Sequence, residues 1–278
     1  MKTNMEKSIR YGMVQGRLTQ SPPNRLQWFP QDSWEDEFVT AAELGVDYIE
    51  LISETKHNPK NPIWSKNGLS KIQELVLEND LTLHALCNDF IIENSLLDHK
   101  VIQQNLDLIN QGKVLGVEKF VMPLFEKSEL NSNNMNDFIE PIRLVAKAAQ
   151  DNNMLTCLET ILTGNELLQL IRLIGLPFVK VVYDTGNRVA FGHDLPHDIR
   201  LLNDQIAHVH IKDKNSNNQN TLLGTGLVDF EQVFSALDDI NYNGPFTFET
   251  VRGTNPVKTA IYNMQLVEFF KGNADSNV

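Results

Sequence analysis

The sequence predicts an α/β fold in which eight parallel strands and their helices close into a single (β/α)8 barrel. Eight short apolar runs recur along the 278 residues, longer stretches with helical spacing separate them, and no low-complexity linker divides the chain. Alternation of strands and helices implies parallel strands joined by right-handed crossovers. Eight such units are the number that closes a barrel, and 278 residues is an ordinary length for one.

Strands are expected where an apolar run is short and ends at a turn. The eight runs cover residues 11–18, 46–52, 81–86, 118–125, 154–160, 179–185, 206–212 and 246–251. Several of them alternate between two kinds of side chain, as expected when one face of each strand fills a barrel interior.

Helices are expected between the strands, where apolar residues recur every three or four positions. These stretches cover residues 32–45, 70–80, 95–116, 135–153, 165–175, 196–204, 229–240 and 255–272. Three of them end in a glycine that suits a left-handed cap, namely Gly45, Gly116 and Gly175. Ser33 is expected to cap the start of the first helix. Asn255, which precedes a proline, is expected to cap the last one.

The whole chain, residues 1–278, is expected to form one barrel domain with a short flexible tail at 272–278. Its net charge is −12, from 24 basic and 36 acidic residues, and no strong basic patch stands out. Such a surface repels phosphate backbones and anionic lipids, so neither nucleic acid nor membrane is expected as a partner. Cys87 and Cys157 lie far apart in apolar runs and are expected to be reduced. With no run of membrane-spanning length and no signal-peptide pattern, a cytoplasmic location is expected.

Four side chains that can bind metal stand at the ends of four successive strands. They are Glu159, Asp184, His210 and Glu249. Active sites in (β/α)8 barrels lie at the carboxyl ends of the strands, where these residues would meet. Because a charged side chain facing the helix layer would be costly, each of the four is expected to face the barrel mouth.

Three carboxylates in one place would repel one another, and a divalent cation removes that conflict. Carboxylate and imidazole ligands suit Mn²⁺, Co²⁺, Mg²⁺ or Zn²⁺, and the absence of thiolates argues against a structural zinc site. A cation that holds a carbonyl group and the neighbouring hydroxyl acidifies the adjacent C–H bond. Glu159 and Glu249 could then pass a proton to and from carbon through an enediolate, which would give epimerisation or aldose–ketose isomerisation.

Each residue also has a simpler explanation. Asp184 could be a turn residue, because a glycine follows two positions later. His210 could be an interior histidine, Glu159 could cap the next helix, and Glu249 could pair with Arg252. Without a metal site, all four simple explanations would have to hold on four consecutive strands. The metal site is therefore favoured.

The segments YDTGN (183–187), HVHIKD (208–213) and LGTGLVDF (223–230), with the strand-terminal glutamates, resemble the sugar phosphate isomerase/epimerase superfamily of xylose isomerase-like TIM barrels. The resemblance covers nearly the whole chain. It implies that Glu159, Asp184, His210 and Glu249 are metal ligands and that the two glutamates are the acid–base pair. Many members carry histidine three residues after the aspartate, where this chain has Asn187, which can bind a sugar hydroxyl but cannot titrate.

Further substrate-binding candidates are His84, Asn187, Lys212, Arg252 and Arg17. His84 could equally belong to the core, and Lys212 and Arg252 could merely pair with acids. The glycine-containing loop at 222–228 could cradle a phosphate or could be an ordinary flexible loop.

The protein is expected to be a metal-dependent isomerase or epimerase that acts on a small sugar or sugar phosphate. A homo-oligomer is a possible assembly. An inosose-type dehydratase of a keto-polyol could use the same site. A DNA-repair endonuclease is opposed by the net charge of −12 and by Asn187. A barrel without catalysis is opposed by the two intact glutamates.

Overall fold

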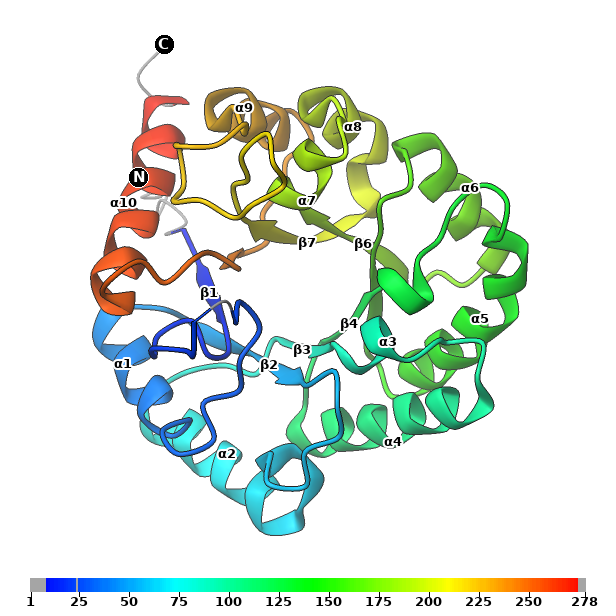
Figure 1. Ribbon diagram of the computed structural model, residues 1–278, viewed down its shortest axis with the longest axis horizontal. Coiled ribbons are helices and arrows are strands. Elements are labelled where there is room, and N and C mark those ends of the chain that lie inside the picture. Colours follow the sequence, from blue (N-terminus) through cyan, green and yellow to red (C-terminus); the bar gives the residue numbers. More distant parts are fainter. Residues whose placement is uncertain (1–8, 24, 275–278) are drawn as a thin grey trace, which may run out of the picture.

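In a computed structural model, which describes residues 9–23 and 25–274 with side chains up to Lys271, eight parallel strands form a closed barrel (Figure 1). The strands are β1 (Tyr11–Val14), β2 (Tyr48–Ser53), β3 (Ala85–Asn88), β4 (Lys119–Pro123), β5 (Leu155–Glu159), β6 (Val179–Asp184), β7 (Ile206–Ile211) and β8 (Phe246–Phe248). Each strand pairs with the next one in the chain, and β8 pairs with β1, so the ring closes. The predicted (β/α)8 fold is therefore confirmed.

Helices surround the strands, and one matches each predicted stretch (Figure 1). They are α1 (Asp36–Leu44), α2 (Lys66–Glu78), α4 (His99–Leu115), α5 (Met135–Asp151), α6 (Gly164–Ile174), α8 (Leu195–Leu202), α9 (Phe230–Asp239) and α10 (Pro256–Ala274). Two short helices that the sequence did not predict, α3 (Phe90–Glu93) and α7 (Thr185–Ala190), follow closely after β3 and β6. The tail expected at 272–278 overlaps the end of α10, and residues 275–278 lie outside the described part.

The predicted ends of three helices are confirmed at glycines, whereas the predicted start of one helix is wrong. The glycines after α1, α4 and α6 adopt left-handed backbone, namely Gly45 (φ 74°), Gly116 (φ 76°) and Gly175 (φ 70°). The predicted cap at Ser33 is wrong, because α1 begins after Glu35. Glu37, in the first turn, is buried and accepts hydrogen bonds from the amides of Gly16 (2.7 Å) and Leu18 (3.0 Å). It therefore fastens the chain that leaves β1.

The third strand begins later than predicted. The apolar alternation at 81–86 indicated a strand, but Thr82 forms only an isolated bridge with Tyr48, and β3 starts at Ala85. His84 consequently precedes the strand and lies at the amino-terminal end of the barrel. Its height in the barrel could not be read from the alternation.

The barrel interior is part apolar and part polar. A small apolar cluster inside the barrel includes both thiols, Cys87 and Cys157, which are buried and free. Other interior side chains are charged or polar and buried, among them Glu50 and His208. Within the described residues, no helix combines the length and the apolar character needed to span a membrane.

Candidate active site

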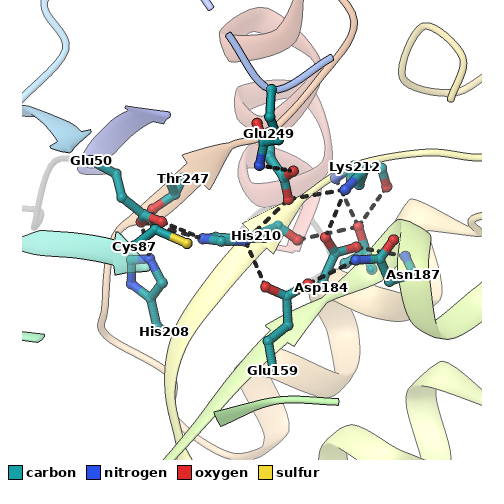
Figure 2. Close-up of polar contacts among 12 residues, drawn as sticks. Glu50, Cys87, Glu159, Asp184, Asn187, His208, His210, Lys212, Thr247 and Glu249 are labelled. Carbon is teal, nitrogen blue, oxygen red and sulfur yellow. Dashed lines mark hydrogen bonds and ion pairs between the residues drawn. The ribbon is translucent and has the colours of Figure 1, made fainter. Parts of the chain in front are cut away.

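The four predicted ligand residues lie together at the carboxyl ends of β5 to β8. Glu159 and Asp184 end their strands, His210 is the last but one residue of β7, and Glu249 directly follows β8. Each offers one ligand atom, and these atoms all lie within 4.8 Å of one another. All four side chains are buried. Figure 2 shows them gathered around the ring of His210.

Asn187 joins two of these acids. Asp184 is the residue that caps α7, and its carboxylate accepts a hydrogen bond from the backbone amide of Asn187 at 2.6 Å. The side-chain amide of Asn187 donates to Oε1 of Glu159 at 2.7 Å. The residue that replaces the expected histidine therefore orients a carboxylate of the cluster (Figure 2).

Cationic and amide donors surround Glu249. The Lys212 ammonium group lies 3.0 Å from Oε2 of Glu249 and 3.4 Å from Oδ2 of Asp184. Gln27, from the first loop, donates to Oε1 of Glu249 at 3.0 Å, and Arg17 lies 3.4 Å from the same atom. The first loop thus reaches the cluster through a side chain that the sequence did not single out.

These surroundings give the acids different proton affinities. Burial, with the charge of Asp184 beside it, raises the pKa of Glu159 to about 8. Burial also raises the pKa of Asp184. Burial alone would raise the pKa of Glu249, but Lys212, His210 and Arg17 outweigh it and hold that pKa well below its usual range. Without a cation, these surroundings therefore favour the protonated form of Glu159 and the ionised form of Glu249.

Glu50 is the most important residue that the sequence did not reveal. It lies in the middle of β2 and is fully buried. Its carboxylate contacts Nε2 of His208 at 2.6 Å and Nε2 of His210 at 3.1 Å. The available signal was an acid inside an apolar run, since a buried carboxylate requires donors. Its partners, more than 150 positions away, could not be identified from that signal.

The chemistry of the cluster fits a divalent cation. Nδ1 of His210 is buried and has no hydrogen-bond partner among the described residues. This atom lies 3.4 Å from a carboxylate oxygen of Glu249 and 3.8 Å from one of Glu159. An unpartnered ring nitrogen beside crowded carboxylates is a donor set that hard and borderline cations take.

Glu159, His210 and Glu249 of the cluster line a cavity of about 350 Å³. The cavity is large enough for a small ligand. Two of the predicted substrate-binding residues, Asn187 and Lys212, line it. His84, Arg17 and Arg252 are not among the residues that line it.

His84 lies at the other end of the barrel. Its ring contacts the Lys119 ammonium group at 2.7 Å through Nε2 and Glu118 at 2.8 Å through Nδ1. Lys119 is the first residue of β4 and also donates to the carbonyl of Ala207 at 2.7 Å. His84 thus makes an interior polar contact at the end of the barrel opposite the strand carboxyl ends, which agrees with the core alternative considered from the sequence.

Arg17 and Arg252 hold the first loop in place. Arg17 donates to the side chain of Gln27 at 2.6 Å and to the carbonyl of Leu26. Arg252 donates to the carbonyls of Gly16 at 2.5 Å and Arg25 at 3.0 Å. Both guanidinium groups therefore bind this loop, and Arg17 in addition lies 3.4 Å from a carboxylate oxygen of Glu249.

The loop at 222–228 turns its amides to a protein carboxylate. Asp213 accepts hydrogen bonds from the amides of Gly224 (3.0 Å), Gly226 (2.8 Å) and Val228 (3.1 Å). A phosphate would need these same donors. The structure therefore favours an ordered loop held by Asp213 over both the phosphate cradle and the flexible loop considered from the sequence.

A closed barrel of parallel strands with a buried polar site at their carboxyl ends is the architecture of the (β/α)8-barrel class, in which active sites lie at that end. The model of the xylose isomerase-like TIM barrel family matches residues 38–268, and the chain belongs to that family.

Relatives and solved structures agree with this assignment. The chain is 21% identical over 259 residues to a putative L-ribulose-5-phosphate 3-epimerase, SgbU, of Escherichia coli K12, a match that covers 85% of this chain and 91% of the relative. A structure of L-ribulose 3-epimerase superposes with a TM-score of 0.77 at 16% identity, covering 96% of each chain. A D-allulose 3-epimerase from Methylomonas sp. gives a TM-score of 0.74 at 17% identity, covering 94% of this chain and 98% of that one.

Proposed function

We propose that this protein is a metal-dependent isomerase or epimerase of a sugar or sugar phosphate that works by proton transfer at carbon. The observation that carries the proposal is the buried cluster of Glu159, Asp184, His210 and Glu249, three members of which line a cavity of ligand size. The names of the relatives, which are sugar epimerases, support it.

The four cluster residues would hold a divalent cation, Mn²⁺, Co²⁺, Mg²⁺ or Zn²⁺. When bound, such an ion polarises a substrate carbonyl group and stabilises negative charge on oxygen. The unpartnered Nδ1 of His210 and the three buried carboxylates support this assignment.

Glu159 and Glu249 are the proposed acid–base pair. They stand on β5 and after β8, on either side of β6 and β7, and both line the cavity. Asn187 orients Glu159, whereas Lys212, Gln27 and Arg17 surround Glu249. Environments that separate the proton affinities of two carboxyl groups are typical of an acid–base pair. One group would remove a proton from carbon and the other would return it.

The residues that line the cavity indicate which class of substrate it suits. The acidic residues Asp89, Glu126 and Glu129 line it, and Lys214 is a basic residue among the lining. The Lys212 ammonium group is already committed to two acids. These walls suit a hydroxyl-rich sugar, and Lys214 is the lining residue best placed to meet a phosphate without leaving an acid of the cluster unpaired.

The test begins with protein stripped of metal by a chelator and reloaded with each of the four cations. Ketoses and ketose phosphates are then incubated with it in deuterated buffer, and exchange at carbon is followed by NMR. Metal-dependent exchange that Glu159→Gln and Glu249→Gln abolish is the expected result. Loss of water, seen by mass spectrometry, would instead indicate the dehydratase. Absence of both reactions over a broad panel with every cation would refute the proposal.

A further inference from the structure

Glu50 is a buried carboxyl group inside the barrel, on the side of the His210 ring that faces away from Glu159 and Glu249. Its side chain is fully buried on β2, and both of its oxygens lie within hydrogen-bond distance of imidazole nitrogens. His208 approaches at 2.6 Å, and His210 approaches at 3.1 and 3.3 Å. An ionised carboxylate can only accept hydrogen bonds, so both Nε2 atoms are donors to it.

The two nitrogens of His210 face different groups. Nε2 faces Glu50, and Nδ1 faces the acids Glu159 and Glu249 of the cluster. Figure 2 shows the ring lying between Glu50 on one side and these acids on the other. The proton that Glu50 holds on Nε2 fixes which nitrogen is left to meet a cation.

We infer that Glu50 is a positioning residue, which holds the ring of His210 in the orientation and tautomer that present Nδ1 to the metal. This inference rests on the proposed metal site. Carboxylates behind a metal-binding imidazole fix its tautomer and increase its basicity. The contact joins β2 to β7 across the barrel, so the orientation is set by the closed barrel and not by the local chain.

His208 completes the arrangement without facing the cluster. Its Nε2 donates to the same carboxylate, and its ring lies beside Thr247, whose hydroxyl is 3.3 Å from that nitrogen. Its Nδ1 is buried and has no partner among the described residues. His208 therefore provides a matched control, because it shares the carboxylate of Glu50 but does not contact the cluster.

The alternative is that Glu50, His208 and His210 themselves hold an ion, since their ligand atoms also lie within 4.8 Å of one another. The two arrangements differ in stoichiometry. A positioning role gives one ion per chain, and a second site gives two, with one ion lost when Glu50 is replaced.

The experiment measures binding of Mn²⁺ by calorimetry to the whole chain and to the Glu50→Gln and His208→Asn variants. Glutamine replaces one of the two carboxylate oxygens by an NH2 donor and removes the negative charge, so the two rings no longer each have an acceptor oxygen of their own. We expect Glu50→Gln to bind about 10- to 100-fold more weakly with one site per chain. His208→Asn is expected to stay within about threefold of the unaltered protein, because its ring does not face the cluster.

A second measurement does not depend on the folding of any variant. In protein with ¹⁵N-labelled histidine loaded with Zn²⁺, the NMR spectrum should place the remaining proton of His210 on Nε2. A proton on Nδ1, equal affinity of Glu50→Gln and the unaltered protein, or two ions per chain would overturn the positioning role. If the unaltered chain binds no divalent cation, the metal site and this inference both fail. If it binds one ion but Glu50→Gln binds it equally well, only the role of Glu50 fails.

Discussion

Replacing Lys212 by methionine should strongly destabilise the metal-free protein. The Lys212 ammonium group is buried, 3.0 Å from Glu249 and 3.4 Å from Asp184, so its removal leaves two buried carboxylates without their nearest cation. Removing one partner of a buried ion pair costs about 3–5 kcal/mol, whereas methionine preserves most of the packing of the lysine stem. We expect the free energy of unfolding to fall by about that amount at about pH 8.

The loss should depend on pH and on metal. Unpaired buried carboxyl groups have pKa values above those of the unfolded chain, so their cost grows as pH rises and shrinks as pH falls. A divalent cation supplies the missing positive charge. Because a ligand that binds only the folded state stabilises it, Mn²⁺ should raise the unfolding free energy more in Lys212→Met than in the unaltered protein.

Urea unfolding followed by circular dichroism, with and without a chelator, measures both effects. Lys214→Met is the matched control, because Lys214 is only half-buried and its ammonium group contacts the exposed side chain of Asn218. That variant should lie within about 0.5 kcal/mol of the unaltered protein. The reasoning is refuted if Lys212→Met costs less than about 1 kcal/mol at about pH 8, or no more than the control.

Three further predictions concern other parts of the chain. Glu159→Gln and Glu249→Gln should each lower substrate deuterium exchange by about 10²–10⁴-fold while the far-UV spectrum is retained, and a loss below tenfold would contradict the acid–base roles. Burial and the Lys119 ammonium group lower the pKa of His84 to about 2, whereas it is about 6.5 in an unfolded chain. As the pH drops below about 6.5, the free energy of unfolding should therefore decrease by up to about 1.4 kcal/mol per pH unit. His84→Gln should flatten that dependence in urea titrations, and an unchanged slope would exclude His84 as its source. Arg252→Met removes two hydrogen bonds that hold the first loop, so limited proteolysis should cut residues 17–31 faster, and an unchanged rate would show that the loop is held elsewhere.

The strand ends illustrate how much of the site the sequence could predict. Glu159, Asp184, His210 and Glu249 each close a local apolar run, and parallel strands that form a barrel end on one face. Two facts, the pattern of each run and the parallel order, were therefore enough to predict that these residues meet. The same local reading gave Gly45, Gly116 and Gly175 as helix ends, because glycine adopts the left-handed backbone of a helix end without steric cost.

The position of each interior side chain along the barrel axis could not be predicted from the sequence. Alternation tells which side chains face inward, but the register between neighbouring strands sets how far along the axis each one lies. His84 and His210 both lie in predicted strands, yet His84 contacts Lys119 at the amino-terminal end of the barrel and His210 lies in the cluster at the other end. Where β3 begins decided the difference.

The sequence by itself determined the barrel, the order of its elements and the four side chains that meet at its carboxyl end, because each depends on local patterns repeated eight times. Only the tertiary structure decided the partners of those side chains. Glu50 contacts the ring of His210, Gln27 donates a hydrogen bond to Glu249, and Asp213 accepts hydrogen bonds from amides of the loop at 222–228. These contacts join residues far apart in the chain, and their distances exist only once the ring of strands has closed in one register.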